Sequence, residues 1–409
     1  MLVISDDHDY EHLGFNGGNP QVTPRIDRLA AEGITFPVSY TQSRCRPTLA
    51  GLLTGLPPHR SGVFSNFVRV DQRERRRVPT DTATLASLLG NAGYLTFAQG
   101  KFWEGSPREY GFEYGRGWDD EFVRRDQDEL FSFLEQVDER PFFVWWAPSL
   151  PHRPHNPPNR LRARFSAAEI DVPSWIRVRD RDAFREAEAT NLAMEAWLDE
   201  GLSQLMDKLK RESLLEDTLV IFMIDNGWAN GFVSKGSAME KSLRTPLVFN
   251  WPGGLEAGLR IQELTSYLDV FPTILDFAAV EPPSHLPGKS LRPLIELRAR
   301  PSRTAIMGAI YPAFANADSN AKDEAIALYI RTESTKYIYW LQDVKQRDNA
   351  QRFRIKHFFL PFPTRSQGDM ELYDLDKDPH EQMNLAHAPS QVATREQLHN
   401  QLIIWWDNE

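Results

Sequence analysis

The residue with the clearest chemical potential is Cys45, the only cysteine in a chain of 409 residues. A lone cysteine cannot form an intramolecular disulfide, and this one lies between Arg44 and Arg46, two residues before Pro47. A thiol between two cations, at the start of a helix-compatible run, is a candidate reactive group. It is equally compatible with a small buried packing residue, so the rest of the chain must decide.

Oxygen ligands follow two short apolar runs that we expect to be buried strands. The two pairs are Asp6 and Asp7 after residues 2–5, and Asp225 and Asn226 after residues 219–224. In open α/β sheets, ligands collect beyond the carboxyl ends of the strands. Three carboxylates and an amide oxygen are hard ligands that suit Ca²⁺ or Mg²⁺. Either pair alone could simply mark a loop, but together they predict one metal site.

Lysines and histidines occupy comparable positions after other strands. The set is Lys101 after the run 95–98, Lys235 after Asp225, and His152 with His155 in the proline-rich loop 148–158. A solvated surface group is the plain alternative for each. Gathered beside a divalent cation, they would form an anion-binding pocket in which lysines hold anionic oxygens and a histidine protonates a leaving oxygen.

The elements that must position these residues alternate between short apolar runs and amphipathic helices. We expect strands at 2–5, 95–98, 142–147, 219–224 and 247–250, and helices at 23–33, 82–91, 191–210 and 268–277. Continuous apolar runs separated by helices indicate a mainly parallel sheet with helices on both faces. The fold class is therefore α/β.

The pattern changes near residue 300. Apolar runs at 305–310, 325–330 and 337–341 lack long crossovers, which predicts a smaller antiparallel sheet. A terminal helix carrying Leu398, Leu402 and Trp405 would close it. We therefore expect a catalytic domain at residues 1–300 and a smaller α+β subdomain at residues 301–409 packed on it.

Composition excludes some classes of partner. The net charge is −10, with 47 basic and 57 acidic side chains spread along the chain, which argues against nucleic acid. No run approaches the roughly 18 apolar residues that a membrane span needs. The chain opens directly on an apolar run, without the basic segment of an export signal. A leader upstream would make the protein periplasmic or secreted, and the sequence leaves the compartment open.

Taken together, these residues resemble the formylglycine-dependent type I sulfatases of the alkaline-phosphatase-like superfamily. The resemblance runs nearly end to end, through ordered motifs. They are Asp6-Asp7, Cys45-Arg46-Pro47-Thr48 with Leu52-Leu53-Thr54-Gly55 (the C-x-P-[ST]-R-A-x-L-L-T-G signature), Gly100-Lys101, Pro151-His152-Arg153-Pro154, Asp225-Asn226-Gly227, Lys235 with Glu240 and Arg244-Thr245-Pro246, Asp269-Val270-Phe271-Pro272-Thr273, and Glu371-Leu372-Tyr373-Asp374-Leu375. So many ordered matches are not expected by chance.

The resemblance implies a mechanism. In the family, a maturation enzyme oxidises the signature cysteine to formylglycine, whose hydrate attacks sulfur with one hydroxyl and expels sulfate with the other. It implies that Cys45 becomes the nucleophile and a metal ligand. It also implies that Ca²⁺, or alternatively Mg²⁺, is held by four further residues: Asp6, Asp7, Asp225 and Asn226. Lys101 and Lys235 would stabilise sulfuryl oxygens, with His152 as general acid and substrate ligand.

Two positions depart from the family pattern. Leu49 stands where the signature has an arginine that steadies the formylglycine and is read by the maturation enzyme, so this departure bears on the conversion of Cys45. Arg46 is a candidate replacement cation, although it projects from a different position. Trp103 stands where the G-K-W-H element has its histidine, and the adjacent Glu104 could contact the nucleophile or substrate, or be a solvated loop acid.

The leading hypothesis is a sulfuric ester hydrolase that releases sulfate from an organic sulfate, with a sulfated carbohydrate as the expected substrate. A phosphodiester or phosphonate monoester hydrolase on the same platform is the second hypothesis, because charge alone separates these anions poorly. The departures at Leu49 and Trp103 motivate a third, a non-catalytic relative that binds anions or glycans. Loops 119–129, 156–179 and 316–323 would set specificity.

Overall fold

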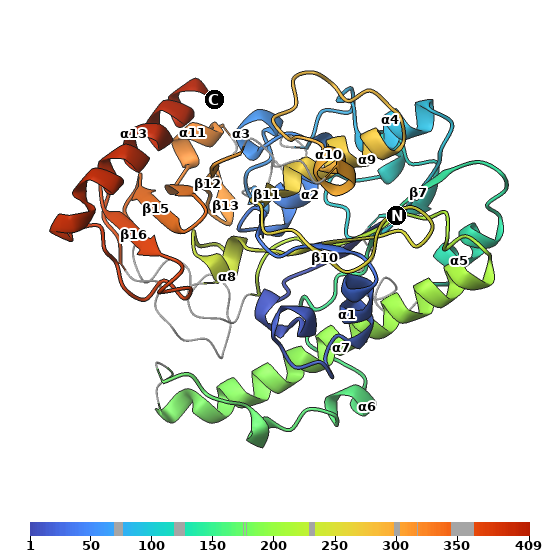
Figure 1. Ribbon diagram of the computed structural model, residues 1–409, viewed down its shortest axis with the longest axis horizontal. Coiled ribbons are helices and arrows are strands. Elements are labelled where there is room, and N and C mark those ends of the chain that lie inside the picture. The colour runs from blue at the N-terminus through green and yellow to red at the C-terminus, as the bar shows by residue number, and fades with distance from the viewer. Residues whose placement is uncertain are drawn as a thin grey trace.

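A large, mainly parallel sheet forms the centre of the molecule in the computed structural model (Figure 1). The structure describes residues 1–68, 77–117, 127–174, 176, 178–228, 234–297, 303–316, 318–344 and 364–409. Most of the predicted specificity loop 119–129 lies outside these ranges. The eight strands, in spatial order, are β10 (Leu259–Arg260), β2 (Ile34–Phe36), β9 (Leu247–Asn250), β8 (Val220–Ile224), β1 (Leu2–Ser5), β7 (Phe142–Ala147), β5 (Leu95–Gly100) and β6 (Tyr114–Arg116).

Strand β1 lies in the middle of this sheet, parallel to both of its neighbours, β7 and β8. Strand β5 continues the parallel arrangement beyond β7. Strand β9 is the exception, because it runs antiparallel to both β8 and β2. The predicted α/β class with a mainly parallel sheet is confirmed, whereas the direction of β9 could not be inferred from its apolar run.

Both faces of the sheet are covered, as the continuous apolar strands predicted. Along β1, Leu2 and Ile4 belong to one core and Val3 belongs to the other, because successive side chains of a strand point to opposite faces. The first core is closed by α2 (Cys45–Thr54), α4 (Leu85–Asn91), α9 (Val270–Phe277) and α10 (Arg292–Leu297). The second is closed by α1 (Pro24–Ala31), α5 (Asp128–Glu135) and α7 (Arg181–Arg211), and Figure 1 shows α1 and α7 on the side opposite α9 and α10.

The C-terminal part forms the predicted antiparallel sheet. Its strands are β12 (Ile306–Ile310), β14 (Ala327–Arg331), β15 (Thr335–Trp340) and β16 (Met370–Asp374), in that order. Helix α13 (Val392–Asn408) packs on it with Leu398, Leu402 and Trp406 buried, whereas the predicted Trp405 is only partly buried. The boundary between domains at residue 300 stays a prediction.

Short elements complete the described chain. Two small strand pairs join distant segments, β11 (Thr265–Ser266) with β3 (Ser39–Tyr40) and β13 (Phe314–Ala315) with β4 (Phe67–Val68). The short helices are α3 (Pro58–Ser61), α6 (Asn159–Arg162), α8 (Glu240–Leu243), α11 (Ala321–Glu324) and seven 3₁₀ turns, Tyr10–His12, Gly14–Asn16, Pro107–Tyr110, Ala167–Glu169, Val178–Asp180, Tyr267–Asp269 and Pro389–Gln391. Among the described residues, no helix is long and apolar enough to cross a membrane.

Two predicted helices differ from the structure at their first residues. Helix α4 begins at Leu85 rather than at residue 82, because Thr84 forms a capping box with Ser87. Helix α7 begins at Arg181, ten residues before the predicted start at 191. Its first turns are mostly polar, so the apolar periodicity used for the prediction begins only further along the helix.

Candidate active site

The site is built at the carboxyl ends of four neighbouring strands. The backbone amide of Asp6, after β1, donates to Leu150 O at 2.8 Å, beyond the end of β7. The amide of Asp225, after β8, donates to Ser5 O at 2.9 Å, and the amide of Lys101, after β5, donates to Ala147 O at 2.7 Å. Parallel pairing therefore brings these side chains to one edge of the sheet, where ligands of such folds collect.

Helix α2 brings Cys45 to this edge from the covering layer. Cys45 is the first residue of the helix and is completely buried. One turn later, Thr48 Oγ1 donates to the carbonyl oxygen of Asp225 at 2.7 Å, which joins the start of the helix to the end of β8. This contact fixes the distance between the cysteine and the strand ends.

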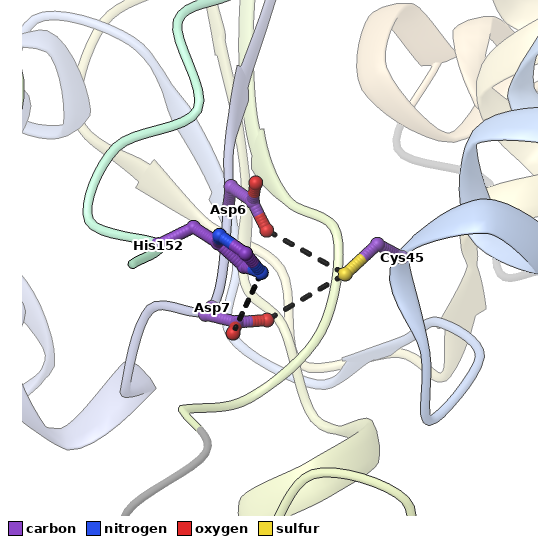
Figure 2. A group of neighbouring side chains, drawn as sticks. All are labelled: Asp6, Asp7, Cys45 and His152. Carbon is purple, nitrogen blue, oxygen red and sulfur yellow. Dashed lines mark hydrogen bonds and ion pairs between the residues drawn. The ribbon is translucent and has the colours of Figure 1, made fainter. Parts of the chain in front are cut away.

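The cysteine lies against the two carboxylates that follow β1. Its Sγ is 3.6 Å from Oδ1 of Asp6 and 3.6 Å from Oδ1 of Asp7. Ligand atoms of Asp6, Asp7, Cys45 and His152 all lie within 4.8 Å of one another, as Figure 2 shows. His155 is not part of this group. Four potential donors from three segments far apart in the sequence thus meet at one point.

Two lysines, the buried Lys101 and the half-buried Lys235, balance the carboxylates. Lys101 forms an ion pair with Asp6, and its Nζ is 3.6 Å from Oδ2 of Asp225. Lys235 forms an ion pair with Asp7, and its Nζ is 2.9 Å from Sγ of Cys45. Burial alone would raise the pKa of both Asp6 and Asp7, but the facing ammonium groups outweigh it and lower the pKa of each.

Two oxygens of the predicted metal ligands have no hydrogen-bond partner among the described residues. They are Oδ2 of Asp225 and Oδ1 of Asn226, and both are completely buried. Burial, followed by the charge of Asp6, raises the pKa of Asp225 well above its ordinary value. Asn226 instead donates Nδ2 to Oδ1 of Asp7 at 2.7 Å. Buried acceptors without donors are the arrangement that a cation would complete, so the residues present fit a hard metal ion.

Burial also governs the remaining two reactive groups. It raises the pKa of the Cys45 thiol, and the charge of Asp225 adds to that effect although Lys101 opposes it. Burial therefore disfavours the thiolate, which is the nucleophilic form of an unmodified Cys45. Burial lowers the pKa of His152, whose Nε2 is 3.8 Å from Oδ2 of Asp7, and the charges of Asp6 and Asp7 oppose the shift.

Arg46 and Glu104, each close in the sequence to one of the two departures from the family signature, form a buried ion pair. Arg46 Nε and Nη2 donate to the two carboxylate oxygens of Glu104 at 2.8 and 3.1 Å, and both side chains are buried. The amide of Val78 donates to the same carboxylate at 2.9 Å. Glu104 is therefore not a solvated loop acid, and contact with substrate stays a prediction for it. Leu49 packs in the core that contains α2.

A buried charge network supports the segment that carries Lys235. Glu240, the first residue of α8, accepts from Tyr40 and lies 3.1 Å from Nζ of Lys336. Lys336 is also 3.0 Å from Glu381, whose Oε2 accepts from the amide of Glu240 at 2.6 Å. Lys336 and Glu381 belong to the C-terminal part. Sequence reasoning missed this role, because it saw Glu240 only as part of a motif and had no signal for its partners.

Helix α8 is also joined to the end of β8. The amide of Gly227 donates to Ser242 O at 3.0 Å. A Cβ atom at Gly227 would lie 1.6 Å from the carbonyl oxygen of Lys241, so only glycine permits this approach. The network around Glu240 therefore holds both the Lys235 segment and the loop that contains Asn226.

Comparison with known proteins identifies the class to which this fold and site belong. The sulfatase family model matches residues 1–280. A second model, described as the C-terminal region of N-sulphoglucosamine sulphohydrolase, matches residues 229–351. The chain belongs to the sulfatase family, within the alkaline-phosphatase-like superfamily. It is a sulfuric ester hydrolase, as the resemblance in the sequence implied.

Two curated relatives align over most of their length. Human N-sulphoglucosamine sulphohydrolase is 27% identical over 474 residues, covering 100% of this chain and 89% of the relative. The ulvan-active sulfatase of Formosa agariphila is 25% identical over 422 residues, covering 99% of this chain and 79% of the relative. Both relatives carry sulfatase names, as the family assignment requires.

Solved structures confirm the architecture. A structure in complex with its substrate D-glucosamine-2-N,6-O-disulfate has a TM-score of 0.75 at 21% identity, covering 100% of this chain and 97% of that chain. The phosphonate monoester hydrolase of Agrobacterium radiobacter has a TM-score of 0.78 at 19% identity, covering 100% and 95%. At these sequence identities, both comparisons support the fold alone.

Replacing Lys336 by methionine should lower the free energy of unfolding by about 3–5 kcal/mol, because Glu240 and Glu381 would remain buried without their shared cation. Urea unfolding followed by circular dichroism measures the change. Lys377→Met is the matched control, because the ion pair of Lys377 with Asp374 lies at the surface and should contribute little. Similar small effects of both substitutions would contradict the proposed support.

Proposed function

We propose that this sulfatase releases inorganic sulfate from a sulfated carbohydrate of the glycosaminoglycan type, using a formylglycine formed from Cys45. The observation that carries the proposal is the placement of Sγ of Cys45, which lies 3.6 Å from two carboxylates and 2.9 Å from Nζ of Lys235. The names of the curated relatives, with sulfated amino sugars and a sulfated polysaccharide among their substrates, support the substrate class.

Conversion of Cys45 solves a chemical problem that the site poses. Burial disfavours the thiolate form of Cys45, whereas an aldehyde hydrate at the same position would offer two hydroxyl groups. One hydroxyl attacks sulfur as the bond from sulfur to the sugar oxygen breaks. The other then loses its proton, the aldehyde forms again and sulfate leaves. The same residue thus serves both half-reactions.

The cations of the site have separate tasks in this mechanism. Lys235 lies beside Sγ of Cys45, so its ammonium group would hold the sulfuryl oxygens during attack. Lys101, which pairs with Asp6, would stabilise the charge near the nucleophile. His152 lies on the Asp7 side with part of its ring exposed, where it can give a proton to the departing sugar oxygen.

Four oxygen ligands, together with residue 45, would hold the metal ion. They are Asp6, Asp7, Asp225 and Asn226. Oδ2 of Asp225 and Oδ1 of Asn226, which lack a hydrogen-bond donor among the described residues, support this assignment, because hard acceptors favour Ca²⁺ or Mg²⁺. When bound, the ion would polarise the nucleophile and compensate the carboxylate charges.

The proposed function also gives a role to each of the two parts of the chain. Residues 1–300 would form the catalytic domain, and residues 301–409 a subdomain that packs on it. The contact of Lys336 with Glu240 supports the packing role, because it lets the C-terminal sheet hold the segment that carries Lys235. No observation favours the phosphonate hydrolase or the non-catalytic alternative.

Substrate preference tests the proposed activity. Matured protein should release sulfate from glucosamine sulfates and sulfated oligosaccharides with a higher kcat/KM than it shows for phosphodiesters or phenylphosphonate esters. Cys45→Ala should lower kcat at least about 10³-fold, because the nucleophile is lost. Faster hydrolysis of the phosphorus esters would overturn the proposal in favour of the second hypothesis.

Mass spectrometry determines whether residue 45 is cysteine or formylglycine. Trypsin should give the peptide 45–60, because Pro47 protects the bond after Arg46. In protein from its own host, this peptide should be about 18 Da lighter than the cysteine form, by loss of SH₂ and gain of O. A fully unmodified thiol in active protein would exclude the formylglycine mechanism.

Metal binding can be followed without measuring activity. After treatment with a chelator, addition of Ca²⁺ or Mg²⁺ should raise the Tm, because the ion binds only the folded protein. Asp225→Ala should lose most of this shift, whereas Asp138→Ala, which changes an exposed carboxylate, should keep it. An equal shift in both variants would remove Asp225 from the metal site.

A further inference from the structure

The two arginines that flank Cys45 have different electrostatic surroundings. The guanidinium of Arg46 is held by both oxygens of Glu104, so its charge is neutralised. Arg44 is 7% exposed and donates Nε to the carbonyl oxygen of Tyr311 at 3.2 Å. Among the residues that the structure describes, no carboxylate forms an ion pair with Arg44. One buried guanidinium beside the nucleophile thus lacks a matching anion.

The position of this guanidinium is set by the segment that carries Lys235. The amide of Gly236 donates to Ser43 O at 2.9 Å. A Cβ atom at Gly236 would lie 2.5 Å from Nη2 of Arg44, so the guanidinium packs directly on the backbone of this glycine, whose φ is +88°. The preceding residue, Lys235, reaches Sγ of Cys45. The guanidinium of Arg44 therefore packs on the residue that follows Lys235, in the segment that reaches Cys45.

A buried charge without a partner costs free energy unless a counterion compensates it. The planar guanidinium also presents a fork of donors that matches the oxygens of sulfate or phosphate in a bidentate manner. Within the described part of the chain, the hydrogen bond of Arg44 runs from Nε to a neutral backbone carbonyl, and no carboxylate forms an ion pair with its charge. An anion that enters beside Cys45 would supply the negative charge that no described carboxylate provides to Arg44 through an ion pair.

We propose that Arg44 is a substrate-binding residue that holds the sulfuryl group at residue 45 by its guanidinium. Arg44 would supply a cation at a site where Leu49 offers none and Arg46 is already neutralised. The inference deepens the proposed function and rests on residue 45 being the reaction centre. The sulfuryl group of the substrate would then lie at the Cys45 end of the site, next to Lys235.

A purely structural role for Arg44 makes a different prediction. If its main task were to join residue 44 to Tyr311, replacing it would lower the Tm. If Arg44 instead serves to bind an anion, a neutral side chain at this position removes a buried charge that has no ion-pair partner. The Tm of the sulfate-free protein should then stay the same or rise. Stability and sulfate binding therefore separate the two roles.

The experiment measures binding of inorganic sulfate to the protein as isolated, by titration calorimetry, and the Tm without sulfate. Arg44→Gln should weaken sulfate binding at least about tenfold relative to the parent protein, because a charged hydrogen-bond donor is lost. Arg60→Gln is the matched control, since Arg60 also donates to a backbone carbonyl but is exposed. Its sulfate affinity should equal that of the parent. Arg44→Met, which fills a similar volume without charge, repeats the comparison should the glutamine variant not fold.

Weaker sulfate binding with an unchanged or higher Tm supports the proposal. Equal affinity of the Arg44 variants and the control overturns it, as does a fall in Tm of both Arg44 variants or the absence of sulfate binding by the parent. Failure of the parent to hydrolyse sulfate esters would count against the proposed function. It would leave the comparison of sulfate affinities intact, so the two failures can be told apart.

Discussion

The buried carboxylates at the carboxyl ends of β1 and β8 dominate the structure around them. Asp6, Asp7 and Asp225 are removed from water, and each must be compensated by a proton or a nearby cation. Lys101 and Lys235 provide two positive charges from distant parts of the chain. Among the described residues, Oδ2 of Asp225 and Oδ1 of Asn226 have no hydrogen-bond donor, which indicates that this compensation is incomplete. The remaining imbalance is the physical argument for the proposed cation site at this sheet edge.

Such a site requires rigid supports, and the protein builds them from hydrogen bonds between layers. Thr48 joins helix α2 to the end of β8, which fixes Cys45 relative to the carboxylates. Glu240 joins α8 to Lys336 of the C-terminal sheet, which holds the chain just after Lys235. Both supports are buried, so their hydrogen bonds and ion pairs are protected from competition with water. The C-terminal sheet therefore contributes to the geometry of the site although it carries none of the predicted site residues.

Residues near the two departures from the family signature are joined by an ion pair. Arg46 follows the nucleophile and binds Glu104, which follows the position where the histidine of the G-K-W-H element is replaced by Trp103. Leu49 packs in the apolar core instead of offering a charge. The neutralisation of Arg46 leaves Arg44 as the flanking cation without a carboxylate partner among the described residues.

The sequence by itself determined the fold class and the residues available for chemistry. Fully buried strands are continuous apolar runs, and polar residues directly after them belong at the ligand-binding edge of the sheet, so β1, β5, β7 and β8 and the residues that follow them could be predicted. The first turns of α7 are polar and have no apolar periodicity, so the sequence did not reveal where this helix begins. A short apolar run does not indicate the direction of its strand, so the direction of β9 was decided only by packing. The partners of Arg44, Arg46 and Glu240 were also decided by the tertiary structure. Ion pairs depend on distances between side chains that lie far apart in the sequence, and no local pattern encodes those distances.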